Sequence, residues 1–486
     1  MSSLTMPSPA VNDPDAVPEP RRNSEFYLLA FAFGVVAFAF LNVAATLKGL
    51  GVGTLFEYMI AFIVITLVAH LAVRRWAPYA DPLLLPIATI LNGLGLVFIY
   101  RLTLAGRFGN AGNSAVRGGT LNVPMTLSTT MTQIIYTLIG VACLVAILKF
   151  VNEPRVLQRY TYIFGLVGMF LIALPAVLPS SISGVADTGA KIQISIGGFS
   201  LQPGEFGRLA LAVFFAGYLI KKRDVLSLAG KRVLGIDLPR GRDLGPILVI
   251  AGINLLLLVF ESDVGMSAVF MGLFVAMLYI ATSRTSWLII GLLLFIVGAL
   301  LAASLFPHVG ERFNVWLYPF SNYNVNVTGD SYQPIQGLYG MGNGGLFGTG
   351  LGAGQPYWTP LIQSDMIFTG FGEELGLAGV MAILLMYGLL VQRGLRTAMM
   401  VKDPFSKLLA GGLAFMFAMQ VFVIVGGVTR LIPLTGITTP FLSQGGSSLI
   451  ANWALIGIFA RISDTARRPA PRPIQDEGLT QVVPIK

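Results

Sequence analysis

Runs of apolar residues, separated by short polar segments, follow one another along almost the whole chain. A helix needs about 20 apolar residues to cross the hydrocarbon core of a bilayer. Twelve runs are long enough, at roughly 25–46, 54–73, 83–100, 129–150, 160–178, 204–220, 244–260, 263–281, 286–305, 367–391, 406–428 and 441–462. Because a helix satisfies its own backbone within lipid, the pattern predicts an all-α polytopic membrane protein with about 12 transmembrane helices.

Composition supports this fold class. Of the 486 residues, 55% are hydrophobic and only 11% are charged, unlike a soluble globular protein. The first 24 residues are rich in proline, serine and acidic residues, and the segment from Thr465 onward is similarly polar. We expect both ends of the chain to be disordered tails, because such segments have too little apolar surface to bury.

Lysines and arginines are concentrated in alternate connecting segments. If the N-terminus is cytoplasmic, the segments that carry Arg74, Arg75 and the cluster from Lys221 to Arg242 all face the cytoplasm. The positive-inside rule therefore predicts a multi-pass protein of the cytoplasmic membrane with both termini inside. The net charge of +9 then reflects topology and contact with anionic membrane lipids, and we expect no nucleic-acid partner.

The chain has one cysteine, Cys143, and two histidines, His70 and His308. Cys143 lies within an apolar run, so we expect no disulfide and no thiolate metal site. The histidines lie far apart in the sequence, which argues against a histidine metal site or a Ser-His-Asp triad. Each is better interpreted as a satisfied or solvated side chain.

Three loops on the non-cytoplasmic side form the large surfaces there, at about 179–203, 306–366 and 429–441. The middle loop has about 60 residues, and a structureless connection of that length is uncommon in a compact protein. We therefore expect this loop to be partly ordered and functional.

Three carboxylates follow at the end of that loop, beside a membrane span. Asp365 precedes a long apolar run, and Glu373 and Glu374 lie about two helical turns further along. Acidic residues at such positions are costly and usually functional. We expect the chemistry of the protein in this segment.

Four motifs occur in order along these outer segments. They are Gln-Pro-Gly-Glu-Phe-Gly-Arg at 202–208, a glycine-rich segment at 333–354, Ser-Asp-Met-Ile-Phe with Glu-Glu-Leu-Gly at 364–376, and Pro-Leu-Thr-Gly-Ile-Thr-Thr-Pro-Phe-Leu-Ser-Gln-Gly-Gly-Ser-Ser at 433–448. Together they resemble the signatures of the shape, elongation, division and sporulation (SEDS) family. The sequences of these motifs are more similar to the elongation branch of the family found in high-GC Gram-positive bacteria.

The resemblance implies a domain organisation. A ten-helix SEDS catalytic membrane domain would occupy 83–462, with two additional N-terminal transmembrane helices at 25–82. The remaining ends, 1–24 and 463–486, would be the disordered cytoplasmic tails.

The resemblance also implies an activity. Members of the family are peptidoglycan glycosyltransferases that polymerise lipid II, an undecaprenyl-linked substrate, into glycan strands at the outer face of the cytoplasmic membrane. The transfer would be inverting, with undecaprenyl pyrophosphate as the leaving group. The implied partner is a class B penicillin-binding protein transpeptidase, which cross-links the strands.

Asp365 is the best candidate for the catalytic base. Glycosyl transfer needs a base for the acceptor hydroxyl and charge stabilisation for the departing pyrophosphate. Asp365 lies in the outer loop at a predicted helix N-terminus, with Ser364 as a cap, and it matches the family's catalytic aspartate. A capping role for Asp365 itself is the structural alternative.

Four further residues are candidates for substrate binding. Glu205 and Arg208 are three residues apart, so they share one helix face and could pair or face a cleft together. The family has lysine where this chain has Arg208, and both residues carry the charge needed to hold pyrophosphate. For Lys191, contact with the substrate and a solvated loop position are equally favoured. Arg430 is a further candidate for contact with the pyrophosphate.

Small polar groups open the last predicted helix. Ser443, Gln444 and Ser447 suit sugar binding at the rim of a cleft or close helix contact. The glycine spacing at 340–345 suits close packing better than a phosphate nest, and it lacks the strand and helix that a dinucleotide fingerprint needs.

Structural or supporting roles are favoured for Glu373, Glu374 and Asp263. Neighbouring residues on a helix are about 100° apart, so Glu373 and Glu374 should face different sides. No cofactor is required by the pattern. Glu261 and Asp263 leave open a divalent cation such as Mg²⁺, because carboxylates are its usual ligands.

Three other functions remain open. A lipid II flippase or another transporter would also suit twelve helices with interior charges. A carrier, however, places ionisable groups near the bilayer midplane, whereas Glu205, Arg208 and Asp365 lie at the outer ends of spans. A division-specific polymerase of the same family is a further alternative, and a non-catalytic scaffold would leave Asp365 dispensable.

Overall fold

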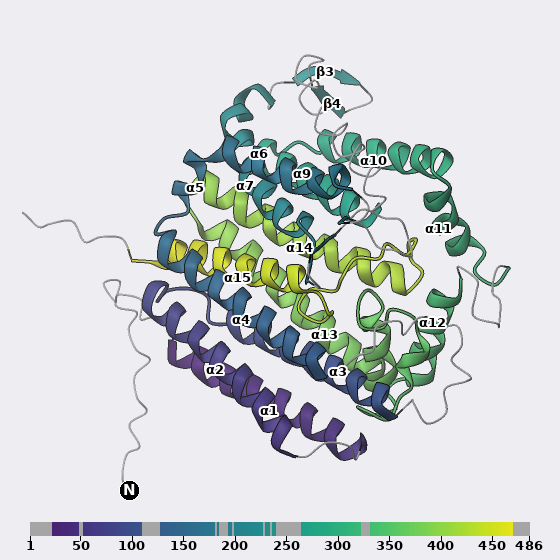
Figure 1. The fold of residues 1–486 in the computed structure, drawn as a ribbon. Coiled ribbons are helices and arrows are strands. Elements are labelled where there is room, and N and C mark those ends of the chain that lie inside the picture. Colours follow the sequence, from purple (N-terminus) through teal and green to yellow (C-terminus); the bar gives the residue numbers. More distant parts are fainter. Residues whose placement is uncertain are drawn as a thin grey trace, which may run out of the picture.

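A computed structural model describes residues 22–47, 52–108, 127–179, 182–183, 193–196, 199–226, 229–233, 236–239, 264–321 and 331–469. Long helices lie side by side with their axes in a common direction (Figure 1). They are α1 (Arg22–Leu47), α2 (Val52–Trp76), α3 (Leu84–Phe108), α4 (Leu127–Phe150), α6 (Thr161–Val177), α7 (Gly204–Leu226), α9 (Val264–Thr282), α10 (Ser286–Leu305), α13 (Ile367–Met400), α14 (Pro404–Val428) and α15 (Gly446–Arg467), with a short α5 (Arg155–Arg159). Eleven of the twelve predicted helices are therefore present, and the one expected at 244–260 lies outside the described residues.

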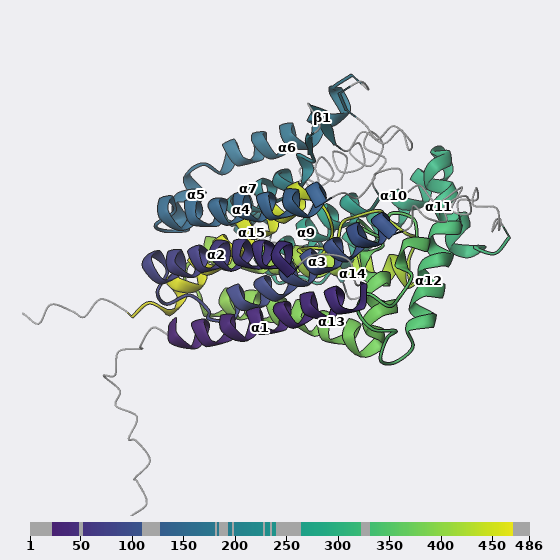
Figure 2. The ribbon, with the colours of Figure 1, turned by 60° about the horizontal axis from the view of Figure 1, so that its bottom comes forward.

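The helices form a membrane bundle with a clear interior. Within the described part of the chain, nine helices are long and apolar enough to span a bilayer. The most apolar windows of α3 and α15 are 94% and 89% buried, whereas that of α10 is only 22% buried. In Figure 2, α1 lies at one side of the bundle and α6 at the other. The predicted all-α polytopic fold is confirmed.

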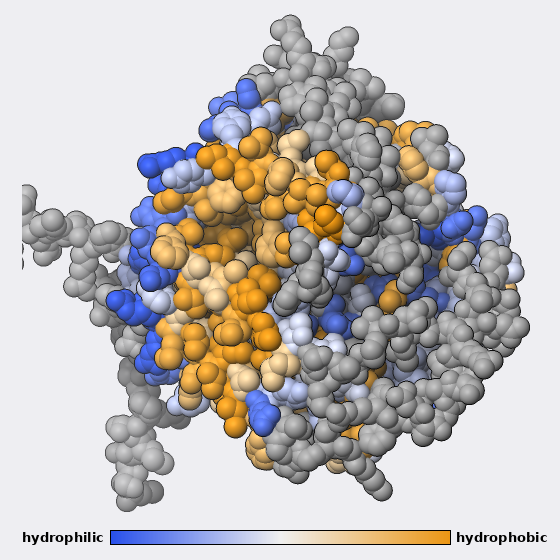
Figure 3. All heavy atoms as spheres, in the orientation of Figure 1, coloured by the Kyte–Doolittle hydropathy of each residue, from blue (hydrophilic) through white to orange (hydrophobic). Residues whose placement is uncertain are grey.

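Two short antiparallel hairpins are the strand structure that the described residues contain. Strand β1 (Ile194–Ile196) pairs with β2 (Phe199–Leu201), and β3 (Ala229–Val233) pairs with β4 (Ile236–Pro239). Figure 3 shows apolar residues over the middle of one face of the molecule and hydrophilic residues along the edge where α5 lies. An apolar band with a polar margin is the surface expected of a protein that sits in lipid.

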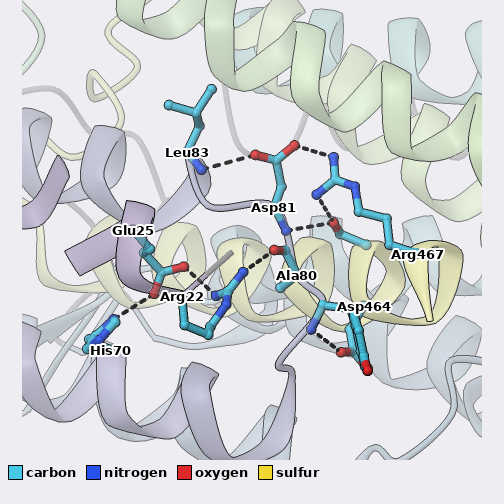
Figure 4. A network of polar contacts seen from close by, with 10 residues as sticks. Arg22, Glu25, His70, Ala80, Asp81, Leu83, Asp464 and Arg467 are labelled. Carbon is cyan, nitrogen blue, oxygen red and sulfur yellow. Dashed lines mark hydrogen bonds and ion pairs between the residues drawn. The ribbon is translucent and has the colours of Figure 1, made fainter. Parts of the chain in front are cut away.

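The two N-terminal helices join the rest of the bundle through buried polar contacts (Figure 4). Arg22 on α1 forms an ion pair with Glu25, 2.5 Å between Nη1 and Oε2, and donates to the carbonyl of Ala80. The other oxygen of Glu25 lies 2.8 Å from Nδ1 of His70 on α2. His70 is thus a buried, satisfied side chain, as one of the two sequence interpretations had it.

The segment between α2 and α3 is tied in turn to the end of α15. The Tyr79 amide donates to Asp464 Oδ1 at 2.9 Å, and the Asp81 amide donates to Ser463 Oγ at 2.9 Å. Arg467 closes the contact with an ion pair to Asp81 Oδ2 at 2.5 Å. Figure 4 shows these groups beside the Arg22 pair, so α1, α2 and α15 share one polar junction.

The structure describes residues 306–321 and 331–366 of the loop expected at 306–366. It contains α11 (Pro307–Leu317), α12 (Tyr332–Gly344) and the 3₁₀ turn η2 (Pro356–Trp358). Val309 of α11 is buried against Ala302 of α10, which fixes α11 at the end of that helix. Figure 1 shows α11 and α12 together at one end of the bundle, here named the loop end.

Candidate active site

Asp365 lies in the turn that leads into α13, at the loop end of the bundle. The expected cap is wrong: Met366 is the N-cap residue, and no side chain caps α13. The helix therefore begins at Ile367, two residues beyond Asp365, and neither Ser364 nor Asp365 satisfies its first amides. The capping alternative for Asp365 consequently loses its basis.

The Asp365 carboxylate is buried with one oxygen unused. Only 6% of the residue is exposed. Oδ2 accepts a hydrogen bond from Gln333 Nε2 of α12 at 3.3 Å, while Oδ1 has no partner of good geometry in the described structure. Burial raises the pKa of Asp365 to about 6, partly offset by nearby backbone amides, by Gln333 and by the charge of Arg312. Such a carboxylate is ionised at neutral pH and is a stronger base than an exposed aspartate.

Short hydrogen bonds hold the turn before α13 against the segment 433–448. Ser443 Oγ donates to the Ser364 carbonyl at 2.5 Å and accepts from the Thr439 amide at 2.8 Å. The Gln444 amide donates to the Gln363 carbonyl at 2.8 Å. Ser443 and Gln444 therefore lie beside Asp365, and both position its backbone.

Ser447 connects the same segment to the start of α7. Its Oγ accepts from the Gln202 amide at 2.8 Å. Gln202 belongs to the first of the four motifs, so motifs far apart in the sequence meet at this end of the bundle.

Glu205 and Arg208 are paired with each other. Arg208 Nη2 lies 2.5 Å from Glu205 Oε2, and both side chains are at most 1% exposed. Arg208 Nη1 also donates to Gln420 Oε1 of α14 at 2.6 Å, and Gln420 Nε2 donates to the Thr438 carbonyl at 3.2 Å. The first of the two predicted arrangements, mutual pairing, is the one in the structure. Through Gln420, Arg208 is linked to the segment 433–448, which contacts the turn before α13 where Asp365 lies.

Arg430 and α11 are joined by two reciprocal hydrogen bonds. Arg430 Nη2 donates to the Trp316 carbonyl at 3.0 Å, and Trp316 Nε1 donates to the Arg430 carbonyl at 3.0 Å. Arg430 has a positive φ of 62°, a strained conformation for a side chain of this size. One helical turn before Trp316 on α11, Arg312 Nη1 donates to the Thr435 carbonyl at 3.0 Å. Arg312 was missed from the sequence because no motif includes it.

Glu373 and Glu374 contact the glycine-rich segment. Glu374 forms an ion pair with Arg101 of α3, 2.6 Å between Oε1 and Nε, and its Oε2 accepts from the Gly352 amide at 3.1 Å. Glu373 Oε1 accepts from the Gln355 amide at 2.8 Å. Both carboxylates thus have several partners, in contrast to Asp365.

Helix α13 is broken at Gly376, where φ is 68° and ψ is −172°. A Cβ on Gly376 would lie 2.3 Å from the Gly348 nitrogen, so only glycine fits this approach. The Thr349 and Gly350 amides donate to the Glu373 and Glu374 carbonyls at 3.0 Å each. These two amides form hydrogen bonds with helix carbonyls beside the break and are not open to a phosphate. Close packing is therefore the favoured interpretation of the glycine-rich segment, over a phosphate nest.

Two predicted site residues, Lys191 and Asp263, lie outside the described residues, as does Glu261. Across the part of the chain that is described, His, Cys, Asp and Glu form no group of three or more suited to a metal ion.

The fold and the site define a polytopic helical membrane protein whose polar motifs converge on one buried carboxylate. The profile of the FtsW/RodA/SpoVE family, described as a cell cycle protein, matches residues 82–468, and the chain belongs to this family. The resemblance drawn from the four motifs is thereby confirmed.

Named relatives refine the comparison. The chain is 46% identical over 463 residues to the Peptidoglycan glycosyltransferase RodA of Mycobacterium tuberculosis, covering 95% of this chain and 94% of the relative. It is 34% identical over 338 residues to the Probable peptidoglycan glycosyltransferase FtsW of Trichlorobacter lovleyi, covering 68% and 82%. The chain is therefore more similar to this RodA protein than to this FtsW protein.

Two solved structures share the fold. A chain from a study of polymerisation and crosslinking by a peptidoglycan synthase complex has a TM-score of 0.55 and 23% identity, covering 76% of this chain and 97% of that one. The Rod shape determining protein RodA of Thermus thermophilus has a TM-score of 0.51 and 21% identity, covering 79% and 96%.

Proposed function

We propose that this protein is a peptidoglycan glycosyltransferase that polymerises lipid II into glycan strands during cell elongation. The name of the mycobacterial relative, 46% identical over 95% of the chain, supports the activity. The lower identity of 34% to an FtsW protein favours elongation over division.

The state of Asp365 carries the proposal. Its buried carboxylate has one unpaired oxygen and a pKa of about 6, so it is mostly ionised at neutral pH and ready to accept a proton. In the reaction, Asp365 takes the proton of the acceptor's sugar 4-hydroxyl as that oxygen attacks the anomeric carbon of the donor. The bond from the anomeric carbon to the diphosphate breaks, and the electron pair leaves with undecaprenyl diphosphate. Attack opposite the leaving group inverts the anomeric centre.

The bundle has two polar ends that suit opposite faces of the membrane. Figure 1 shows α5 and the end of α15 at one side and α11 and α12 at the other. The first of these ends carries Arg155, Arg159 and Arg467, whereas Asp365 lies at the loop end. The positive-inside rule assigns the basic end to the cytoplasm and the loop end to the outer face. Both tails would then be cytoplasmic.

A lipid-linked substrate also needs space for its chain. An apolar cavity of about 300 Å³ opens between α4, α5, α6, α7 and α15. Its lining runs from Leu157 of α5 and Arg461 of α15, at the basic end, to Phe206 of α7, two residues before Arg208. A prenyl chain gains free energy by entering such a cavity because apolar area leaves water or is packed more closely.

The proposed partner is a class B penicillin-binding protein transpeptidase in the same membrane. The fold is shared with a chain from a peptidoglycan synthase complex, which supports an assembly of this kind. A divalent cation such as Mg²⁺ remains a proposal that rests on Glu261 and Asp263. Removing divalent cations with EDTA tests it directly: a cation requirement predicts lost activity that Mg²⁺ restores.

Purified protein in proteoliposomes with fluorescent lipid II tests the function. We expect glycan polymer on a gel, and no exchange of lipid II between leaflets beyond that of empty vesicles. Exchange without polymer, with and without the partner transpeptidase, would identify the flippase alternative instead.

A further inference from the structure

The cations at the loop end differ in what they already bind. Arg208 is 1% exposed and engaged by Glu205 and Gln420, so its charge is neutralised inside the bundle. A phosphate could reach it only if the buried ion pair with Glu205 opened, which is strongly unfavourable. Arg430 directs Nη2 to the Trp316 carbonyl. Arg208 therefore has no open fork, whereas Arg430, like Arg312, donates to one backbone carbonyl but is not among the charges that act on Asp365.

Arg312 has an open guanidinium fork. It is half-buried on α11, and its hydrogen bond to the Thr435 carbonyl is the only one it makes to the described residues. A guanidinium has five N–H donors in a fixed plane, so most of the fork remains available to a ligand. This is the usual state of an arginine that recognises a diphosphate.

Two contacts one helical turn apart fix the position of Arg312. Arg312 and Trp316 are four residues apart and share a face of α11. That face lies on the segment after α14, through Arg312 to Thr435 and through Trp316 to Arg430. The other side of α11 rests on α10 through Val309. A guanidinium held in this way loses little conformational entropy when it binds a ligand.

Arg312 and the turn that carries Asp365 both contact the segment 433–448, Arg312 through Thr435 and the turn through Ser443, and the two residues do not pair. The charge of Arg312 acts on the Asp365 carboxylate, yet no ion pair within 4.0 Å joins the two. Asp365 Oδ1 is unpaired as well. A cation and a base that are not paired with each other can bind different groups of one substrate, the carboxylate its hydroxyl and the guanidinium its anionic group.

We propose that Arg312 forms a diphosphate-binding subsite next to Asp365 and contacts the phosphate oxygens of the lipid-linked substrate. This inference rests on the proposed function, and it assigns to Arg312 the role that the sequence suggested for Arg208 and Arg430. The guanidinium stabilises the negative charge that builds on the diphosphate as the bond to the sugar breaks.

Binding of undecaprenyl diphosphate and of uncharged undecaprenol to the purified full-length protein tests the subsite. For Arg312→Gln we expect affinity for undecaprenyl diphosphate to fall by about 10- to 100-fold, the range for a lost hydrogen bond to a charged group. Affinity for undecaprenol should stay within about twofold of wild type. Arg312→Lys should lose less than Arg312→Gln, because it keeps the charge but not the fork.

Arg155→Gln is the matched control. It also removes one arginine charge, but at an exposed ion pair with Asp403 at the opposite end of the bundle. Its binding should equal that of wild type. The proposal is overturned if folded Arg312→Gln binds undecaprenyl diphosphate within about twofold of wild type, or if it loses undecaprenol equally, since the latter shows that α11 has merely shifted.

Polymerisation of lipid II separates this inference from the proposed function. The acid limb of the pH–rate profile should move to higher pH in Arg312→Gln, because loss of a nearby cation raises the pKa of Asp365 further. If wild type makes no polymer, the proposed function fails, while the binding measurement still decides the subsite. If wild type and Arg312→Gln polymerise with equal KM and equal acid limbs, only the subsite fails.

Discussion

Replacing Asp365 with asparagine should make the protein more stable at neutral pH, although it removes the candidate base. The carboxylate is buried, and one oxygen lacks a partner, so its ionised form is poorly solvated. Asparagine has nearly the same shape, can still accept the hydrogen bond from Gln333, and carries no charge. Residues at active sites often reduce stability in this way.

The raised pKa gives the magnitude. A rise from the ordinary value of 3.8 to about 6 corresponds to about 3 kcal/mol of disfavoured ionisation. Asparagine leaves a buried N–H donor unpaired, which costs about 1–2 kcal/mol. We therefore expect Asp365→Asn to be about 1–2 kcal/mol more stable than wild type at about pH 8.

The pH dependence provides the sharper test. Because the pKa of Asp365 is raised on folding, the folded protein binds more protons than the unfolded chain between 3.8 and about 6. Wild type therefore loses stability as the pH rises through this window and carries the whole cost above it. The advantage of Asp365→Asn should be about 2 kcal/mol smaller at about pH 4.5 than at about pH 8.

Unfolding in mixed detergent micelles at the two pH values measures both quantities. Other titrating groups cancel when wild type and variant are compared at each pH. The exposed Glu153→Gln is a suitable control and should match wild type within about 0.5 kcal/mol. The reasoning is refuted if Asp365→Asn is less stable than wild type at about pH 8, or if its advantage does not shrink on acidification.

Three further predictions concern activity and packing. The rate of polymerisation should fall on acidification with an apparent pKa near 6, measured as the acid limb of kcat/KM; a flat profile through that range contradicts Asp365 as the base. Gly376→Ala should destabilise the protein by roughly 2–5 kcal/mol, because φ is positive and the new Cβ meets the Gly348 nitrogen at 2.3 Å; an unchanged unfolding free energy would show that the helix break is not rigid. Arg208→Ala should destabilise by about 3–5 kcal/mol by stranding Glu205, and adding Glu205→Ala should restore part of the loss; additive losses in the double variant would rule out a structural pair.

The membrane helices were predictable because apolar length is a direct requirement of the bilayer. The run at 286–305 coincides with α10. The ends of helices were less accurate where polar residues continue them: the run ending at 220 belongs to a helix that reaches Leu226. Lys221, Lys222 and Arg223 are good helix formers, so the helix extends beyond the apolar stretch into the polar margin.

Part of the site could be read from local spacing, and part could not. The three-residue separation of Glu205 and Arg208 indicated their possible pairing, which the structure shows. The role of Arg312 depends on contact with Thr435, 123 positions along the chain, and no local pattern encodes it. The prediction that Ser364 caps α13 is wrong. The Ser364 carbonyl accepts a hydrogen bond from Ser443, and α13 starts two residues after Asp365.

The rate of lipid II polymerisation by Asp365→Asn, in proteoliposomes at about pH 7.5, tests the central claim most directly. The account predicts a folded protein that still binds lipid II but polymerises it at less than about a hundredth of the wild-type rate, since general base catalysis contributes at least about that factor. Polymer at more than about a tenth of the wild-type rate would contradict the assignment of Asp365 as the base.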